Sequence, residues 1–423
     1  MNKFETALEF IKDKITPESE FYQKIYLVGG CVRDELLGIR FTDLDLLVNM
    51  PEGQKRFVEY MCEKFPKECR GPFYYKRYGT TAMDVLINDT FVLVECVEPH
   101  IEQYNEEGTE LIATHFCTLE EDAKRRDFTC NALYKNLHTG EVLDPTGLAK
   151  QDLRHNFLRT PGDPYEIFKQ DPVRMLRGIR FKRQKGFTLD PKAWKAIEDL
   201  HEIIVNSAET RMREEIHKMI KCKDAHGAFW DLYRSGLMAV LFPGMEKFMS
   251  KDIRPEYVHE KFTLWSHTRL ALDVQYREHP HTPTSAKLVV LFADIALVGG
   301  IEIVEEIFNN SLLGKEKVNT TIFLIKSYIR LRTLFYKGEY TGRRASTLPR
   351  FIRSLGQQRT DFRRLVRALN HGLKEEYLLP YKIFFDNPQL PQPKKVEPRR
   401  KRTAAKSSIS PKGKSVKEEG FGG

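Results

Sequence analysis

The sequence lacks a long hydrophobic run. Its most apolar stretch, residues 288–300, contains Asp294 and is shorter than the roughly 18 residues that a membrane span needs. The N-terminal segment lacks the basic-then-apolar order of a secretory signal peptide. Cysteine pairs are missing too, because the seven cysteines are scattered and never spaced as C-x-x-C. These absences argue against a disulfide framework and a zinc site, and they predict a cytoplasmic protein with no membrane partner and small, buried cysteines.

Acidic residues do not balance the basic ones. The chain has 68 Lys and Arg against 59 Asp and Glu, which gives a net charge of +9. Much of the excess lies in residues 391–423, which hold ten Lys or Arg and three Glu. This end of the chain has few apolar residues, so we expect a disordered basic tail that adds salt-sensitive RNA affinity or only improves solubility.

Two hydrophobic patterns divide the remaining sequence. Between about residues 26 and 136, short β-like runs such as TAMDVLI and FVLVECV alternate with the helical run FVEYMCEKF. From about residue 167 onward, apolar residues recur with a helical period, as in TIFLIKSYIRLRTLFY. We therefore predict an α+β protein in four parts. These are a head of mixed sheet and helices (1–140), a helical neck (141–210), a helical body (211–386) and the tail (387–423).

The segment LVGGCVRD, residues 27–34, predicts a phosphate-binding turn followed by a metal site. A strand that ends in Gly29 and Gly30 and leads into a helix lets backbone N–H groups approach a phosphate, and Arg33 could pair with that phosphate. Further on, Asp43 and Asp45 alternate with a leucine, so on a strand their carboxylates would share one face. Such neighbours repel unless a cation lies between them, which favours Mg²⁺. An isolated D-x-D is more often a solvated strand face, but the glycines upstream favour the metal site.

A two-metal site needs a further carboxylate. Glu95 is our candidate, because it shares a predicted strand face with Phe91, Leu93 and Val97, and an acid on an apolar face needs a partner. Asp84 in TAMDVLI is the second candidate.

These strings resemble the class II tRNA nucleotidyltransferases and bacterial poly(A) polymerases, which belong to the polymerase-beta-like nucleotidyltransferase superfamily. The matching segments occur in family order from about residue 25 to 190: LVGGCVRDELLG, TDLDLLV, RYGTT, RRDFTCNALY, LDPTGLAKQDLRHNFLRTP and QDPVRMLRGIRFKRQKGF. The resemblance implies a polymerase-beta-like head on a helical neck and body. It also implies Mg²⁺ as cofactor, and ATP and CTP as substrates.

The resemblance assigns roles to individual residues. Asp43 and Asp45 would bind the metal ions, with Glu95 at the third acidic position. The residues implied to bind the nucleotide are Gly29, Gly30, Arg33, Arg125, Arg126, Asp127, Asn131, Asp171, Arg174, Arg177 and Arg180. The chemistry is suitable, because guanidinium groups bind phosphate and an aspartate accepts a ribose hydroxyl. Without the resemblance, residues 125–127 would be interpreted as a solvated basic turn.

The segment QDPVRMLR, residues 170–177, resembles the family's nucleotide-selecting motif. Cytosine and adenine present an amino donor beside a ring-nitrogen acceptor, whereas guanine and uracil reverse this order. Asp171, which only accepts, and Arg174, which only donates, would therefore fit C and A. An ordinary helix N-cap beside solvated arginines also explains the local pattern. Gln170 stands where the family usually has an acid, and His100 lies near the position where the family often has arginine.

The C-terminal half gives weaker signals. Residues 264–268 and 291–295 resemble traces of a histidine–aspartate phosphohydrolase domain, but Ala293 occupies a position of the doublet that a metal would need. We therefore expect His267 to be an ordinary, partly buried histidine, and we expect no phosphohydrolase activity. Residues 325–344 mix Lys and Arg with aromatics, which predicts either RNA binding or a helix with a solvated basic face.

The sequence thus predicts a Mg²⁺-dependent, template-independent RNA nucleotidyltransferase that adds CMP and AMP to RNA 3′ ends. The tRNA 3′ end is the first expected substrate. A poly(A) polymerase that adds AMP to general RNAs is the alternative, which the basic tail favours. A non-catalytic RNA-binding relative that kept the scaffold also stays open, because Gln170 and His100 depart from the family pattern.

Overall fold

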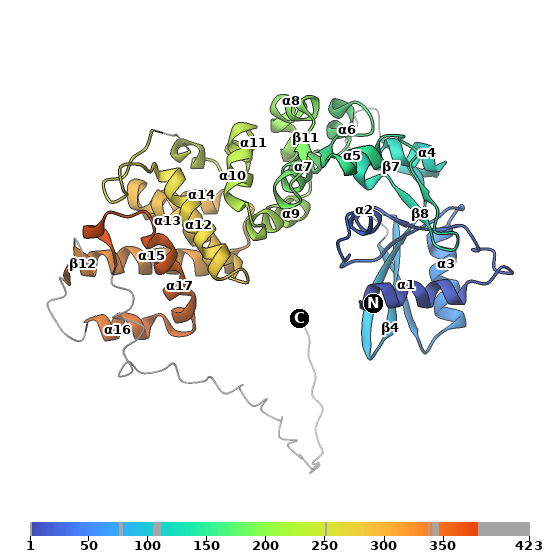
Figure 1. The fold of residues 1–423 in the computed structure, drawn as a ribbon, viewed down its shortest axis with the longest axis horizontal. Helices are drawn as coiled ribbons and strands as arrows, with labels where there is room; N and C mark the ends of the chain where they lie inside the picture. Colours follow the sequence, from blue (N-terminus) through green and yellow to red (C-terminus); the bar gives the residue numbers. More distant parts are fainter. Residues whose placement is uncertain are drawn as a thin grey trace, which may run out of the picture.

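The computed structural model describes residues 2–75, 79–104, 111–249, 252–336, 339–340 and 347–379. The predicted tail and two residues of the RYGTT segment, Arg77 and Tyr78, lie outside these residues. The molecule is elongated, with the sheet-containing head at one end, the helical body at the other end, and the neck between them (Figure 1).

A seven-stranded mixed sheet forms the head, in the order β3-β4-β5-β2-β1-β8-β9. Its strands are β1 (Ile25–Val28), β2 (Asp45–Val48), β3 (Cys69–Tyr75), β4 (Thr80–Ile87), β5 (Thr90–Val97), β8 (Tyr134–Asn136) and β9 (Val142–Leu143). Strands β2 and β5 are parallel, and the other neighbours are antiparallel. A separate ribbon contains β6 (His100–Tyr104) and β7 (Leu111–Phe116). The mixed sheet confirms the fold predicted for the head.

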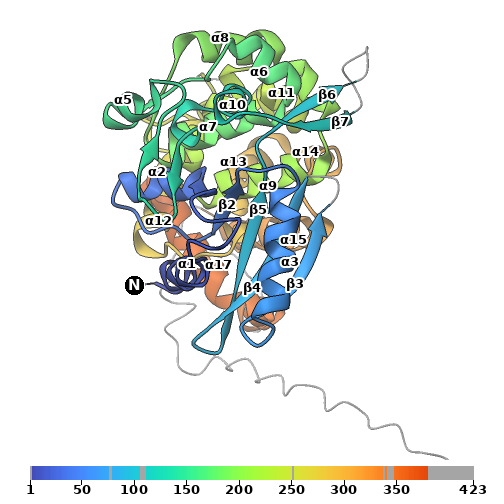
Figure 2. The same ribbon diagram turned by 90° about the vertical axis from the view of Figure 1, so that its right-hand side faces the viewer.

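Helices cover the two faces of this sheet unequally. On one face, α1 (Lys3–Lys14) and α3 (Gly53–Lys64) pack against β4 and β5. On the other face, α4 (Leu119–Lys124) covers the β1, β2 and β8 side through a small apolar cluster with Val28, Leu47 and Tyr134. Seen from the head end, α3 lies in front of the sheet and the body helices α15 (Lys315–Leu334) and α17 (Arg359–Asn370) lie behind it (Figure 2). The second face of the sheet is therefore turned toward the body.

Helices dominate the neck and the body, as the helical spacing of the apolar residues predicted. The remaining helices are α2 (Gly30–Leu36) in the head, then α5 (Ala149–Arg154), α6 (Pro164–Gln170), α7 (Val173–Gln184), α8 (Pro191–Leu200), α9 (Glu209–Lys221), α10 (Ala225–Arg234), α11 (Leu237–Leu241), α12 (Leu264–Glu278), α13 (Thr284–Gly299), α14 (Ile301–Asn309) and α16 (Thr347–Ser354). Two short strand pairs accompany them: β10 (Phe157–Leu158) with β11 (Thr188–Leu189), and β12 (Phe335–Tyr336) with β13 (Glu339–Tyr340). Pro172 separates α6 from α7, because proline disfavours a helical backbone at the residue before it. Asp171 is accordingly extended, with φ −148° and ψ 94°.

His267 is entirely buried in the body, so the expectation of a partly buried side chain is wrong. Its Nδ1 lies 2.6 Å from Asp294 Oδ2 and its Nε2 lies 3.1 Å from the carbonyl oxygen of Leu369. Since both ring nitrogens face acceptors, both carry protons and the imidazole is cationic. Burial alone would lower the pKa of His267, but the Asp294 carboxylate raises it above its usual range. This ion pair joins α12 to α13 inside the body core.

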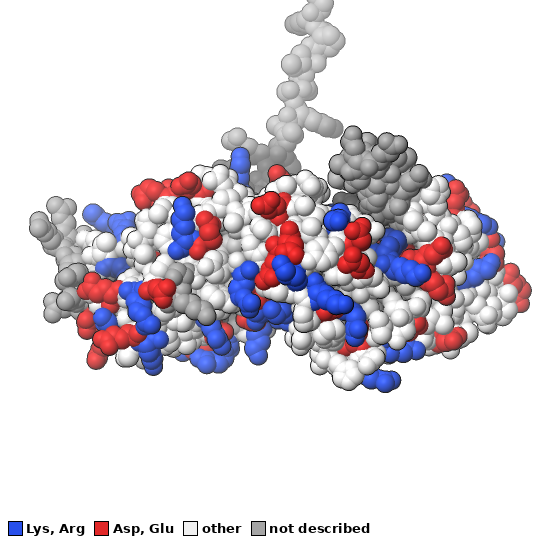
Figure 3. All heavy atoms as spheres, turned by 90° about the horizontal axis from the view of Figure 1, so that it is seen from above, with Lys and Arg blue, Asp and Glu red and all other residues white. Residues whose placement is uncertain are grey.

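Basic and acidic side chains are mixed on the surface of the molecule. Viewed from above, Lys and Arg gather over the middle of the molecule, with acidic residues interspersed among them (Figure 3). No helix within the described ranges is long and apolar enough to cross a bilayer. All seven cysteines are free, and apart from the half-buried Cys62 they are buried, as expected.

Candidate active site

A cavity of about 360 Å³ lies between the head and the neck, and most of the predicted site residues line it. The predicted residues in its walls are Gly29, Asp45, Glu95, Arg125, Arg126, Asp127, Asp171, Arg174 and Arg177. His100 and Arg211, which we did not predict as site residues, also line it. The predicted residues outside the lining are Gly30, Arg33, Asp43, Asn131 and Arg180.

The carboxylates lie at one end of the cavity. Asp45 is the first residue of β2, and the parallel pairing with β5 brings Glu95 directly beside it. Asp43 precedes the strand in a bend and is exposed, so the predicted alternation along one strand is wrong for this residue. Its charge still acts on the other two. Burial, Asp43 and Glu95 raise the pKa of Asp45 to about 7, and burial and Asp43 raise the pKa of Glu95.

Asp84 is outside this group. It lies opposite Leu93 in the β4–β5 ladder, and its carboxylate forms an ion pair with Arg70. Because Asp84 already has a cationic partner and does not line the cavity, Glu95 is the better candidate for the third acid.

The three carboxylates fit a divalent cation that is bound together with a nucleotide. Burial and then their mutual repulsion raise the pKa values of Asp45 and Glu95, and a cation between the carboxylates would relieve the repulsion. In the part of the chain that the structure describes, no three His, Cys, Asp or Glu side chains converge closely enough to hold a metal ion by themselves. Mg²⁺ is commonly held by one or two carboxylates together with substrate phosphates. Asp43, Asp45 and Glu95 therefore suit Mg²⁺ better than a metal that needs a complete protein cage.

One buried carboxylate holds the two arginines at the cavity wall. Asp122 on α4 accepts hydrogen bonds from Arg125 Nε and Nη2 at 3.0 and 2.7 Å, and from Arg126 Nε at 2.9 Å. Tyr134 Oη donates to the same carboxylate at 2.7 Å. Burial disfavours its charge, yet Arg126 and Arg125 hold the pKa of Asp122 well below its usual range. Both guanidinium groups are thus fixed at the cavity wall, and that of Arg126 lies next to the positive-φ turn at Gly29.

Asp127 connects the head to the neck. It accepts hydrogen bonds from Arg177 Nε of α7 at 2.8 Å and from Asn131 Nδ2 at 3.0 Å. Burial opposes its charge, but Arg177 lowers the pKa of Asp127 to about 2. This carboxylate stays ionised and can accept a hydrogen bond from a hydroxyl group.

Two of the arginines predicted to bind the nucleotide have protein partners in this structure. Arg33 donates to Asn131 Oδ1 at 2.6 Å and to Asp34 Oδ1 at 2.8 Å. Arg180 donates to the buried Glu215 at 2.5 Å. Both arginines are buried and lie outside the cavity lining, so they support the residues around the cavity in this structure.

Asp171 and Arg174 lie at the neck end of the cavity. Arg174 Nε is 3.7 Å from Asp171 Oδ2, and its Nη1 donates to the carbonyl oxygen of Ile167 at 3.2 Å. Arg211 of α9 donates Nη1 and Nη2 to the two oxygens of Asp171, at 3.0 and 2.6 Å. Sequence reasoning missed Arg211 because nothing local connects residues so far apart in the chain. The sequence contains a partial signal: Arg211 and Glu215 are four residues apart, so both lie on one face of α9, and an arginine and a glutamate on one face indicate that this face can contact other charged side chains.

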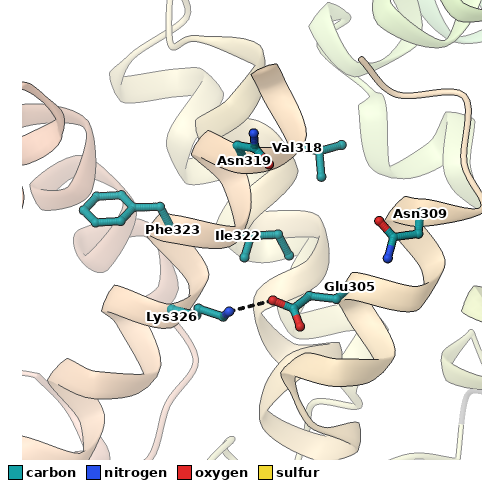
Figure 4. Close-up of a pocket in the computed structure, with 7 residues that line it drawn as sticks. All are labelled: Glu305, Asn309, Val318, Asn319, Ile322, Phe323 and Lys326. Carbon is teal, nitrogen blue, oxygen red and sulfur yellow. Dashed lines mark ion pairs between the residues drawn. The ribbon is translucent and has the colours of Figure 1, made fainter. Parts of the chain in front are cut away.

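A second cavity, of about 450 Å³, lies in the body between α14 and α15 (Figure 4). Its carboxylate, Glu305, is 2.6 Å from Lys326. The other lining residues are amides and apolar side chains: Asn309, Val318, Asn319, Ile322 and Phe323. This lining has no cluster of charges comparable to that between head and neck, so the head–neck cavity is the candidate active site.

Two segments of the chain match known protein families. Residues 25–159 match the family described as "Poly A polymerase head domain", and residues 186–249 match "Probable RNA and SrmB- binding site of polymerase A". The chain is 31% identical over 259 residues to the tRNA nucleotidyltransferase cca2 of Schizosaccharomyces pombe, covering 57% of this chain and 52% of the relative. It is 31% identical over 227 residues to poly(A) polymerase I of Haemophilus influenzae, covering 53% and 49%. The chain thus spans about half the length of these curated relatives.

Solved structures show the same fold. The Bacillus stearothermophilus CCA-adding enzyme in complex with CTP superposes with a TM-score of 0.58 at 21% identity, covering 90% of this chain and 83% of that chain. Two segments of the chain therefore match the head domain and the probable RNA-binding site of poly(A) polymerases, and the chain has the fold of solved CCA-adding enzymes, which confirms the family resemblance of its sequence.

Proposed function

We propose that this protein is a template-independent RNA nucleotidyltransferase that transfers CMP and AMP from CTP and ATP to RNA 3′ ends and releases pyrophosphate. The addition of CCA to tRNA is the specific reaction that we propose. The observation that carries the proposal is the head–neck cavity of about 360 Å³, which combines the Asp45 and Glu95 carboxylates, two fixed arginines and an Asp–Arg pair. Asp43 lies outside the lining, but its charge acts on Asp45 and Glu95. The tRNA nucleotidyltransferase and poly(A) polymerase I among the relatives support the reaction class. The cytoplasmic location stays a prediction from the sequence.

Each wall of the cavity has a task in this proposal. Arg125 and Arg126 bind triphosphate oxygens beside the glycine turn, and Asp127 accepts a hydrogen bond from the ribose. Asp43, Asp45 and Glu95 would hold Mg²⁺, which when bound neutralises triphosphate charge and lowers the pKa of the RNA 3′-hydroxyl. The 3′-hydroxyl loses its proton to solvent water as its oxygen forms a bond to the α-phosphorus, and the bond from that phosphorus to the pyrophosphate oxygen breaks.

The neck end of the cavity would select the base. Asp171 can accept the amino hydrogens of cytosine or adenine, and Arg174 can donate to the neighbouring ring nitrogen. Guanine and uracil would place an acceptor against Asp171 and a donor against Arg174, which is unfavourable. The bidentate ion pair with Arg211 fixes both oxygens of Asp171, so the carboxylate is oriented before a nucleotide binds.

Replacing Arg211 by glutamine should reduce the preference for CTP and ATP over UTP and GTP by about tenfold or more, because a hydrogen bond to a charged group contributes roughly 1.5–3 kcal/mol. Without Arg211, the Asp171 carboxylate can turn toward Arg174, which is 3.7 Å away, and the two would neutralise each other. The measurement is kcat/KM for each nucleoside triphosphate. Arg213→Gln is the control, because Arg213 Nε donates to the carbonyl oxygen of Leu312 at 2.6 Å and not to the cavity. An unchanged preference in Arg211→Gln would show that Asp171 needs no support from α9.

The proposed function is tested by offering each triphosphate separately, with Mg²⁺, to a tRNA that lacks its terminal CCA and to an unstructured RNA. We expect incorporation of both CTP and ATP, and preferentially into the tRNA. Incorporation of ATP alone, on either RNA, would identify a poly(A) polymerase. If the folded protein bound RNA but incorporated none of the four nucleotides, it would be a non-catalytic RNA-binding relative and the proposed function would be wrong.

A further inference from the structure

Among the described residues, the extensive helix contacts of β3, β4 and β5 come from α1 and α3, and these strands have a second face opposite those helices. By the strand register, this surface contains Arg70, Phe73, Tyr75, Asp84, Leu86, Phe91 and Leu93, and we call it the open face. Tyr75, Phe91 and Leu93 are exposed by 44, 43 and 41%. Helices α1 and α3 pack on the opposite face. Large apolar side chains grouped in this way on a soluble domain usually mark an interaction site.

The open face is continuous with the carboxylate end of the cavity. Glu95 lies opposite Ala82, and Leu93 is the next β5 residue on the same side. At about 3.3 Å per residue, Leu93 is roughly 7 Å and Phe91 roughly 13 Å from Glu95 along the strand. These spacings correspond to the first few nucleotides that would precede a strand end held at Glu95.

The chemistry of the open face suits bases better than phosphates. The Arg70 guanidinium lies 4.2 Å from the centre of the Phe91 ring and is paired with Asp84, the acid within the patch. This pairing offsets the acidic charge, while 62% of the Arg70 side chain stays exposed. Unpaired bases stack on aromatic rings and on arginine planes without regard to their sequence.

The path of the RNA is limited by the other walls of the cavity, which leave only the side of Glu95 and the open face. In the proposed function, the triphosphate lies against Arg125 and Arg126, and the incoming base lies against the neck. An RNA strand with its 3′-hydroxyl near Asp45 and Glu95 must therefore leave the cavity on the Glu95 side. That path crosses the open face, which is turned toward the body (Figures 1 and 2).

We propose that the open face is a stacking platform for the last unpaired nucleotides of the RNA strand that is extended. Tyr75, Leu93 and the Phe91–Arg70 stack hold the bases, and the 3′-hydroxyl lies at the carboxylates. The inference rests on the proposed function for the direction of the strand.

The test compares Tyr75→Ala/Phe91→Ala with wild type and with Tyr74→Ala, using the full chain. Tyr74 is the matched control, because it is also exposed, at 47%, but its hydroxyl donates to Glu59 of α3 on the opposite face. The protein is mixed, in the absence of nucleoside triphosphates, with an RNA that carries 2-aminopurine next to its 3′ end. Stacking of this base on an aromatic ring quenches the 2-aminopurine fluorescence. We expect wild type and Tyr74→Ala to quench it and the double variant not to do so.

Steady-state addition gives the second readout. The KM for RNA should rise at least about tenfold in the double variant, because stacking contributes roughly 1–3 kcal/mol per base, while the KM for ATP stays unchanged. Equal quenching and an RNA KM within about twofold of wild type would overturn the proposal, as would an equal loss in Tyr74→Ala. A change of oligomeric mass with an unaltered RNA KM would also overturn it, by showing a protein contact.

Two further results keep the outcomes distinct. If the double variant does not fold, the single exposed substitution Leu93→Ser provides the same comparison. If the wild-type protein quenches the 2-aminopurine fluorescence but incorporates no nucleotide, the proposed function is wrong and the stacking platform is confirmed.

Discussion

Replacing Asp43 and Asp45 together by asparagine should lower nucleotide addition at least about 10³-fold while RNA binding stays near the wild-type level. The substitution keeps the shape of both side chains and removes the charges that would hold Mg²⁺. It also removes repulsion among three coupled carboxylates, so the thermal stability should be equal or higher. Addition is measured at saturating nucleotide, and RNA binding by fluorescence anisotropy.

Asp89→Asn is the matched control for this double variant. Asp89 is an exposed acid in the turn between β4 and β5, where its φ is 59° and asparagine is well tolerated. We expect full activity from it. If the double variant kept more than about a tenth of the wild-type rate, Asp43 and Asp45 would not be the metal ligands and the proposed mechanism would be wrong.

Replacing His267 by alanine should destabilise the protein by about 3–5 kcal/mol, because it leaves the Asp294 carboxylate charged, buried and without its main partner. The free energy of unfolding is measured in urea. Replacing both His267 and Asp294 by leucine should cost less than His267→Ala alone, since apolar residues can fill a site from which both charges are gone. A loss below about 1 kcal/mol in His267→Ala would show that the pair is not held as the structure has it.

The same ion pair predicts a pH dependence. Because the folded state raises the pKa of His267, its stabilisation is fully present below the unfolded pKa of about 6.5 and is lost as the pH rises through the folded value. We expect the unfolding free energy of wild type to decline over this range more steeply than that of the leucine double variant. Parallel pH profiles would contradict the assignment of a charged His267.

Local patterns were sufficient to predict much of the head and part of the site. The glycine pair after β1, the acid at the start of β2 and Glu95 within β5 are all encoded in short stretches with clear alternation. Glu95 could be placed because it interrupts an apolar strand face. The sequence does not show that Asp43 lies in a bend, because the residue at which a strand begins depends on its neighbours in the sheet.

The remaining site residues depend on long-range contacts. The sequence does not indicate a role for Asp122, because an acid near the start of a helix is usually solvated. Only the fold buries this carboxylate between two arginines and a tyrosine. Arg211 meets Asp171 through the packing of α9 on α7. His267 was misjudged for the same reason, because its partner is on another helix. Burial of a polar group follows from tertiary packing, which periodicity alone does not specify.

The parallel pairing of β2 with β5 has a consequence for how the head can diverge. Residues can be added to the loops between these strands without disturbing the acids, because the loops lie outside the ladder. A single residue inserted within β5 ahead of Glu95 is different, since it would reverse the side-chain alternation and turn the carboxylate toward α1 and α3. Insertions and deletions among descendants of this chain should therefore occur at the ends of β2 and β5 and not within these strands.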